Sequence, residues 1–136
     1  MSLTQHFKKL GAPLKNSRRS WGAVRASDNA VFLRVWQDQK IRIDGKSYMM
    51  LTHHNAYVGN EGSPGYKERL DHVRLAMAGA RVYMTMCIVR DPAETPRKIK
   101  SFIEENVFLG GKIVEHEGDS WIEQAGRIDR FSISHM

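Results

Sequence analysis

The side chains best suited to chemistry lie in one stretch, residues 20–38, where large aromatic and guanidinium groups alternate with aliphatic ones. Runs of period two on either side of the polar turn 27–29 predict a β-hairpin. With a loop of two or four residues, antiparallel pairing places five large side chains on one face: Trp21, Arg25, Phe32, Arg34 and Trp36. Such a face is suited to stacking on flat ligands or bases and to contacting phosphates. The alternative is that another element of the fold covers it.

Six histidines raise the alternative of a metal-dependent enzyme. His53 and His54 end a predicted strand, and His72 lies on the helix predicted after them, with Glu68 and Asp71 nearby. A strand histidine followed by a helix histidine loosely resembles the ββα-metal nuclease site, in which one histidine activates water and others hold a divalent ion. The second strand of that motif and a bracing CxxC pair are missing. We therefore predict no metal, no cofactor and no catalytic residue, and keep a small divalent-metal nuclease using these three histidines as the alternative function.

Signatures of other enzyme classes and of membrane proteins are missing from the sequence. It has no GxSxG, no P-loop and no GxGxxG, and Glu115-His116-Glu117 lacks the lysine of a PD-(D/E)xK site. The single cysteine, Cys87, sits in an apolar run and is expected to be a buried thiol in a reducing, cytoplasmic setting. No apolar run approaches the roughly 20 residues that span a bilayer, and residues 1–10 do not resemble a signal peptide. We therefore predict no membrane association.

Positive charge is concentrated in the N-terminal part of the chain. Of 21 Lys and Arg, ten lie in residues 1–50, against only three Asp and Glu there. A local positive field attracts polyanions by counterion release. We therefore predict a non-catalytic module that binds nucleic acid, with DNA as the expected partner, and leave open a homodimer and a protein-interaction or regulatory role. The residues assigned to nucleic-acid contact are Arg18, Arg19, Trp21, Arg25, Phe32, Arg34, Trp36, His53, His54, Asn55, Arg97 and Lys98.

The elements that position these residues follow from the spacing of apolar side chains. Helices are predicted over 3–10 and 66–80, with a further short helix over 97–105. Hairpins are predicted around Asp44-Gly45 and Gly118-Asp119, with a doubly covered strand over 81–89 and a last strand over 127–133. The longest loop, 52–65, would rim a site, and Gly110-Gly111 indicates a bulge or a tight bend. Together these predict one α+β domain, residues 1–136, whose mixed or antiparallel sheet is curved and barrel-like, with one main helix and one or two short ones.

Several segments resemble uncharacterised bacterial domains associated with restriction and HNH-type endonuclease genes. The segments are 15–22, 31–38, 68–70 and 96–99. The predicted barrel with flanking helices is similar to PUA-like domains of the EVE and SRA kind, which hold a modified or flipped base against an aromatic wall. The resemblance implies a modified-base reader or a restriction-associated accessory protein. No pocket residue of those families is carried over, and the chain has no second, nuclease domain, so the resemblance implies binding without cleavage.

Overall fold

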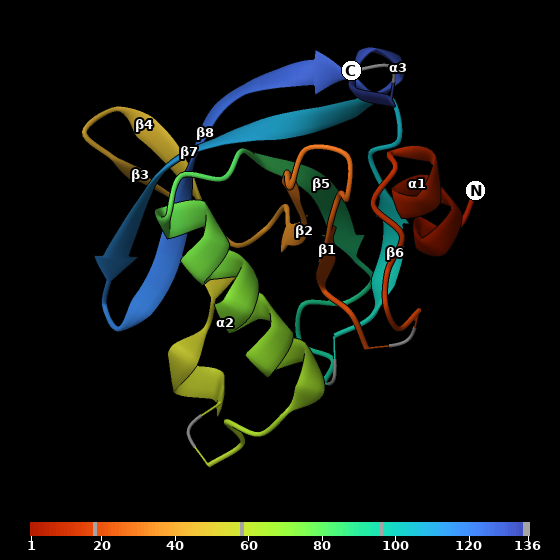
Figure 1. Ribbon diagram of the computed structural model, residues 1–136. Coiled ribbons are helices and arrows are strands. Elements are labelled where there is room, and N and C mark those ends of the chain that lie inside the picture. The colour runs from red at the N-terminus through yellow and green to blue at the C-terminus, as the bar shows by residue number, and fades with distance from the viewer. Residues whose placement is uncertain (18, 58, 96, 135–136) are drawn as a thin grey trace.

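An eight-stranded mixed sheet is the frame of the described part of the molecule, which comprises residues 1–17, 19–57, 59–95 and 97–134 of this computed structural model (Figure 1). The strands are β1 (Gly22–Val24), β2 (Val31–Trp36), β3 (Lys40–Ile43), β4 (Lys46–Thr52), β5 (Val82–Val89), β6 (Ile99–Phe102), β7 (Asn106–His116) and β8 (Asp119–Asp129). The helical elements are α1 (Leu3–Lys9), the 3-10 turn η1 (His54–Tyr57), α2 (Pro64–Met77) and α3 (Arg130–Ser134). The strand order is β1-β2-β5-β7-β8-β4-β3, with β6 attached to β5. The α+β class is thereby confirmed.

Both hairpins before α2 form as predicted, because their turns carry residues that accept a left-handed backbone. Asp44 and Gly45 have φ of 51° and 79°, and Ile41 pairs with Tyr48. In the first hairpin Ala23 pairs with Phe32, and the Arg25 N–H donates to the Ala30 carbonyl across the turn. This register places Arg25 and Phe32 on the same face of the hairpin, as predicted.

Two apolar layers lie on the two sides of the sheet. On one side α2 contributes Val73 to a cluster with Leu33 of β2 and Met84 of β5. On the other side α1 contributes Phe7 to a second cluster that contains Phe32. Strand β5 is covered on both sides, as its continuous apolar pattern predicts. It pairs with β2 in parallel.

The sheet does not close into a barrel, and a side chain of α2 bridges the gap between two of its strands. The buried Arg69 guanidinium donates through Nη1 to the Leu51 carbonyl of β4 at 2.6 Å. Through Nη2 it donates to the Arg34 carbonyl of β2 at 2.6 Å and to the Trp21 carbonyl just before β1 at 3.0 Å. Arg69 thus satisfies carbonyls that a further pairing strand would otherwise have to reach.

Three predictions of the C-terminal half are wrong in their elements or bounds. Residues 97–105 do not form a helix: β6 lies there and pairs with the part of β5 that β7 leaves free. The last hairpin turns at Glu117-Gly118, one residue earlier than predicted, because these two residues take positive φ. The predicted strand 127–133 is the end of β8, which runs to Asp129 and is followed by α3.

The predicted bulge at Gly110 is confirmed, since the register of β7 against β8 shifts on both sides of this residue. A Cβ atom at Gly110 would lie 2.6 Å from Cδ1 of Ile122, so the close approach needs glycine. No helix within the described residues is long and apolar enough to cross a membrane.

Candidate functional site

One end of the predicted aromatic and basic face is covered by the protein itself. Phe32 is 1% exposed and Arg25 is 4% exposed, and the Arg25 guanidinium lies 5.0 Å from the centre of the Phe32 ring. Arg25 also donates to the carbonyls of Leu10 and Ile133, and it pairs with Asp28 at 2.6 Å, which lowers the pKa of the Asp28 carboxyl to about 2. As a correction to the open face predicted from the sequence, α1 and α3 hold both side chains away from solvent.

The other end of this face is half-covered, and Trp36 there is stacked by a cation from another segment. The Arg97 guanidinium lies 4.8 Å from the Trp36 ring centre. Arg97 is itself held by the Asp38 carboxylate, with a contact of 2.7 Å to Oδ2. Arg97 thus contacts both the Trp36 ring and the Asp38 carboxylate at the end of β2.

Trp21 belongs to an aromatic cluster at the N-terminal end of α2. Its ring lies 5.4 Å from that of Tyr57, which stacks on Tyr66 at 4.6 Å with an interplanar angle of 12°. Gly65 gives the indole room, since a Cβ there would lie 2.4 Å from Nε1 of Trp21. The Arg69 guanidinium lies 5.7 Å from the same indole. Trp21 and Tyr57 are half-buried, so the cluster is part of the surface as well as of the packing.

Arg34 differs from its neighbours because its guanidinium forms no hydrogen bond and no ion pair with any residue the structure describes. The side chain is half-buried, and burial lowers its pKa. Glu68 is the carboxylate that acts on it, but Oε2 of Glu68 accepts from Ser20 Oγ at 3.3 Å, and Oε1 is buried without a partner among the described residues.

The charges of Arg34 and Arg69 act on each other, and that one carboxylate acts on both. Burial lowers the pKa of Arg69 to about 9, and repulsion from Arg34 contributes in the same direction. The three groups therefore leave one positive charge without compensation in a partly desolvated place. An anion of the size of a phosphate oxygen group is the kind of ligand that would offset it.

His53 and His54, which follow β4, form side-chain contacts with residues near the starts of α2 and β8. Nδ1 of His54 lies 2.8 Å from the Tyr66 hydroxyl of α2, and Nε2 lies 2.9 Å from Ser120 Oγ at the start of β8. The Ser120 hydroxyl donates to Glu115 at 2.9 Å, and His53 Nδ1 lies 3.0 Å from Asp119. Because the Ser120 proton points to Glu115, the serine is not arranged to lose it to His54 as a nucleophile would.

His72 is not part of this arrangement. It is 6% exposed, burial lowers its pKa to about 4, and its Nδ1 has no partner among the described residues. Within that part of the chain, no group of three or more His, Cys, Asp or Glu side chains is arranged to hold a metal ion. The three histidines considered for a nuclease are therefore not brought together as metal ligands.

The remaining predicted site residues are spread over the surface or are not described. Arg19 and Lys98 are exposed, whereas Arg18 and the side chain of Asn55 lie outside what the structure describes. Cys87 is a free buried thiol, as predicted, and burial raises its pKa to about 11.

Tyr66, Ser120, Glu115 and Arg69 were missed as members of the site. Sequence spacing gives no signal for the first three, because His54 and Ser120 are 66 positions apart. An arginine on the packed side of an amphipathic helix was the one available signal for Arg69. In comparisons with known proteins, no family model, no curated protein and no solved structure matches this chain.

Proposed function

We propose that this chain is a non-catalytic nucleic-acid-binding module, with DNA as its partner, and that Arg34 takes a phosphate group. The observation that carries the proposal is the half-buried Arg34 guanidinium, which has no hydrogen bond or ion pair with a described residue and whose charge repels that of the buried Arg69. A partly desolvated guanidinium forms stronger hydrogen bonds to phosphate than a fully solvated one. An unpaired charge of this kind is unfavourable in the free protein, and a bound phosphate would compensate it.

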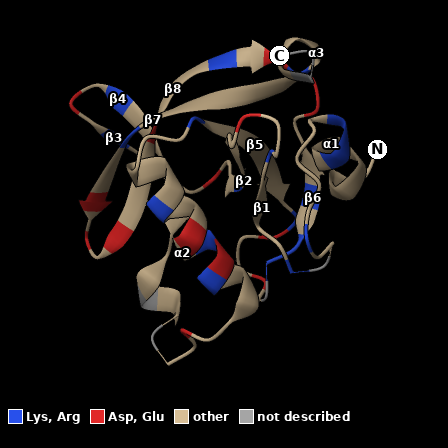
Figure 2. Cartoon of the chain, in the orientation of Figure 1, with Lys and Arg blue, Asp and Glu red and all other residues tan. Residues whose placement is uncertain are grey.

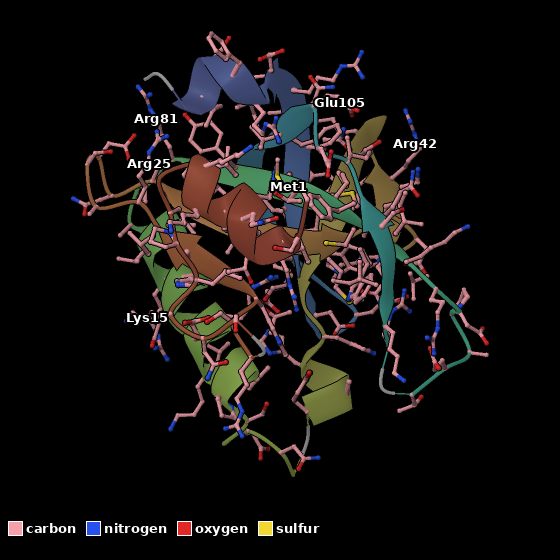
Figure 3. All side chains as sticks on the ribbon, turned by 90° about the vertical axis from the view of Figure 1, so that its right-hand side faces the viewer. Met1, Lys15, Arg25, Arg42, Arg81 and Glu105 are labelled. Atoms are coloured by element: carbon pink, nitrogen blue, oxygen red, sulfur yellow. The ribbon has the colours of Figure 1, made fainter. Side chains whose placement is uncertain are left out.

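The surroundings of Arg34 support a polyanion rather than a small anion. Trp36 lies two residues along the same strand, and Trp21 lies across from Arg34, whose N–H donates to the Trp21 carbonyl. Both indoles are half-exposed and offer surfaces on which bases stack. The basic residues of α1 lie on one side of the molecule (Figure 2), and Lys15 lies below α1 when that side faces the viewer (Figure 3).

A finer form of the proposal is that the module reads a modified or flipped base, as PUA-like domains do. The half-exposed cluster of Trp21 and Tyr57 supports it, because these rings lie where η1 meets the start of α2 and remain partly accessible. In this form the bound base would stack against the cluster while its phosphate meets Arg34.

The proposal is tested by fluorescence anisotropy with a labelled 20-nucleotide DNA, single- and double-stranded, at several salt concentrations. We expect measurable binding whose Kd rises with salt. Arg34→Gln should weaken it about tenfold, the loss of one charge-assisted phosphate contact, and should reduce the salt slope by about one. Arg74→Gln is the matched control, because Arg74 is an exposed arginine of α2 that pairs with the equally exposed Asp71 of the same helix.

Two results would contradict the proposal. One is the lack of salt-dependent binding by the unmodified chain to either form of DNA. The other is an equal effect of Arg34→Gln and Arg74→Gln, which would mean that only net charge matters. A thermal unfolding curve of each variant shows that any loss of binding occurs in folded protein.

A further inference from the structure

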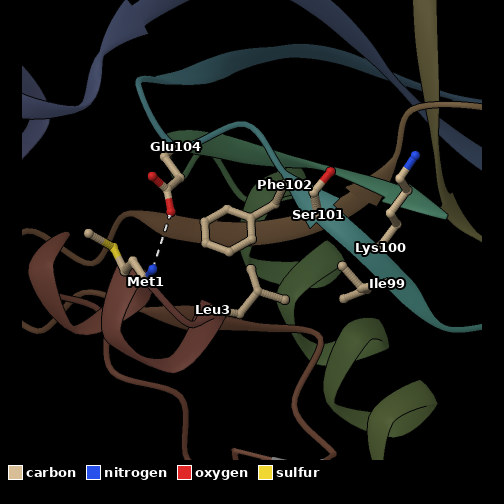
Figure 4. A pocket seen from close by; sticks show the side chains of 7 residues that line it. All are labelled: Met1, Leu3, Ile99, Lys100, Ser101, Phe102 and Glu104. Carbon is tan, nitrogen blue, oxygen red and sulfur yellow. Dashed lines mark ion pairs between the residues drawn. The ribbon is translucent and has the colours of Figure 1, made fainter. Parts of the chain in front are cut away.

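A groove with a volume of about 330 Å³ lies between the start of α1 and strand β6 (Figure 4). Its lining residues are Met1, Leu3, Ile99, Lys100, Ser101, Phe102 and Glu104. The terminal amine of Met1 lies 3.7 Å from Glu104, and this ion pair marks one end of the groove. None of these residues belongs to the candidate nucleic-acid site, so the groove can be considered independently of the proposed function.

The groove follows the backbone edge of β6 rather than one of its faces. All four residues of the strand line it, although side chains of successive strand residues point to opposite faces. Among the described strands β6 pairs only with β5. The Ile103 N–H donates to the Met86 carbonyl of β5 at 2.9 Å, so in an antiparallel ladder the N–H and carbonyl of Phe102 point away from β5.

We propose that β6 accepts an extended acidic peptide segment of a partner protein as an added strand. The free backbone groups of the strand edge supply hydrogen bonds, which is the basis of recognition by β-strand addition. The side chain of Leu3 in α1 lies across the groove from Ile99 and Phe102 (Figure 4). These three apolar side chains can contact apolar side chains at alternate positions of the bound segment. Lys100, exposed beside them, suits an acidic side chain between those apolar positions.

Electrostatic charge and backbone chemistry distinguish three possible ligands of the β6 edge: a second copy of this chain, a nucleic acid and an acidic peptide. A second copy of this chain would bring two molecules together that each carry a net charge of +6, and their repulsion opposes pairing through β6. A nucleic acid would also be attracted by the lysine, but it has no backbone groups that match a strand edge. An acidic segment with alternating apolar residues can pair with Lys100, contact Leu3 and form backbone hydrogen bonds with the edge of β6 at the same time.

The test is fluorescence anisotropy with a fluorescein-labelled hexapeptide of alternating glutamate and valine. We expect saturable binding, with loss of at least about tenfold in affinity when the alternate backbone nitrogens that face β6 are methylated, because each methyl group removes a donor. Both alternate sets of nitrogens are methylated in separate peptides, and only one set should matter. Lys100→Glu should weaken binding about 3- to 10-fold, whereas Lys112→Glu, the same change at an exposed lysine of β7, should change it less than about twofold.

Several outcomes would overturn the inference. Absence of saturable binding, equal binding of both methylated peptides, or equal effects of Lys100→Glu and Lys112→Glu would each rule out strand addition at β6. A dimer that sedimentation detects and that Lys100→Glu abolishes would assign the groove to a second copy instead. Displacement of the peptide by DNA in the Arg34→Gln variant would assign it to nucleic acid. Binding that follows the methylation pattern would support the inference even if the unmodified chain binds no DNA.

Discussion

Replacement of Arg69 by methionine tests the most unusual feature of the fold. The change keeps an unbranched side chain of moderate length on α2 and removes the donors to the carbonyls of Leu51, Trp21 and Arg34. With a pKa of about 9, the guanidinium remains protonated at pH 7 and donates all three hydrogen bonds there. We expect the variant to fold but to lose the link between β2 and β4.

The expected loss can be worked from these three contacts. Each buried or part-buried carbonyl left without its donor costs roughly 1–2 kcal/mol, and the cost of burying the charge in the unmodified chain offsets part of the sum. We therefore expect Arg69→Met to lower the free energy of unfolding by about 3 kcal/mol. Arg69→Lys should lose about half of that, because one ammonium group cannot reach three carbonyls on separate segments.

The measurement is equilibrium urea unfolding, followed by circular dichroism. With a urea m-value of about 2 kcal/mol/M for a chain of this size, a loss of 3 kcal/mol moves the midpoint down by about 1.5 M. Arg74→Met, on the exposed side of the same helix, should change the free energy of unfolding by less than about 0.5 kcal/mol. Equal midpoints for the Arg69 and Arg74 variants would refute the view that Arg69 holds the two strands together.

Two further predictions concern acid stability and the aromatic cluster. Burial lowers the pKa of both His6 and His72 from 6.5 to about 4, so the neutral rings stabilise the fold fully above pH 6.5. That stabilisation, about 3 kcal/mol per histidine, should be lost as the pH falls from 6.5 to 4. In urea unfolding, the stability of His72→Phe should therefore depend on pH about half as strongly as that of the unmodified chain. An unchanged pH dependence would contradict the role of buried neutral His72. Gly65→Ala should destabilise the fold by about 1–3 kcal/mol and shift the emission of Trp21, because its Cβ would lie 2.4 Å from the indole nitrogen. Gly62→Ala, whose Cβ would meet nothing within 4 Å, is the control, and equal effects of the two changes would disprove the reasoning.

The sequence predicts the fold well where local chemistry decides. The turn at Asp44-Gly45 determines both the hairpin and its register, and the apolar run of β5 predicts its doubly covered position. The prediction fails at residues 97–105, whose apolar spacing matched a helix. There β6 gains backbone hydrogen bonds at the part of the β5 edge that β7 does not occupy, and such a tertiary contact is not encoded in local spacing.

For the candidate site, the sequence predicts which side chains share a face but not what covers them. Register alone brings Arg25 onto the face of Phe32, as observed. Whether that face meets solvent depends on α1 and α3, which come from opposite ends of the chain. The contacts of His54 have the same origin, since they join segments that no local pattern links.

Arg25, Arg69 and Arg34 differ in whether their guanidinium groups have a structural role or are available for binding. Arg25 and Arg69 donate to backbone carbonyls, so their guanidinium groups serve structural hydrogen bonds within the fold. Arg34 has no such contact with a described residue, although its side chain is half-buried. If its role is to bind phosphate, Arg34→Gln should leave the free energy of unfolding unchanged or raised, because it removes an uncompensated charge that the free protein tolerates. A loss near the 3 kcal/mol expected for Arg69→Met would instead make Arg34 a structural residue, and weaker DNA binding by that variant would then reflect a damaged fold.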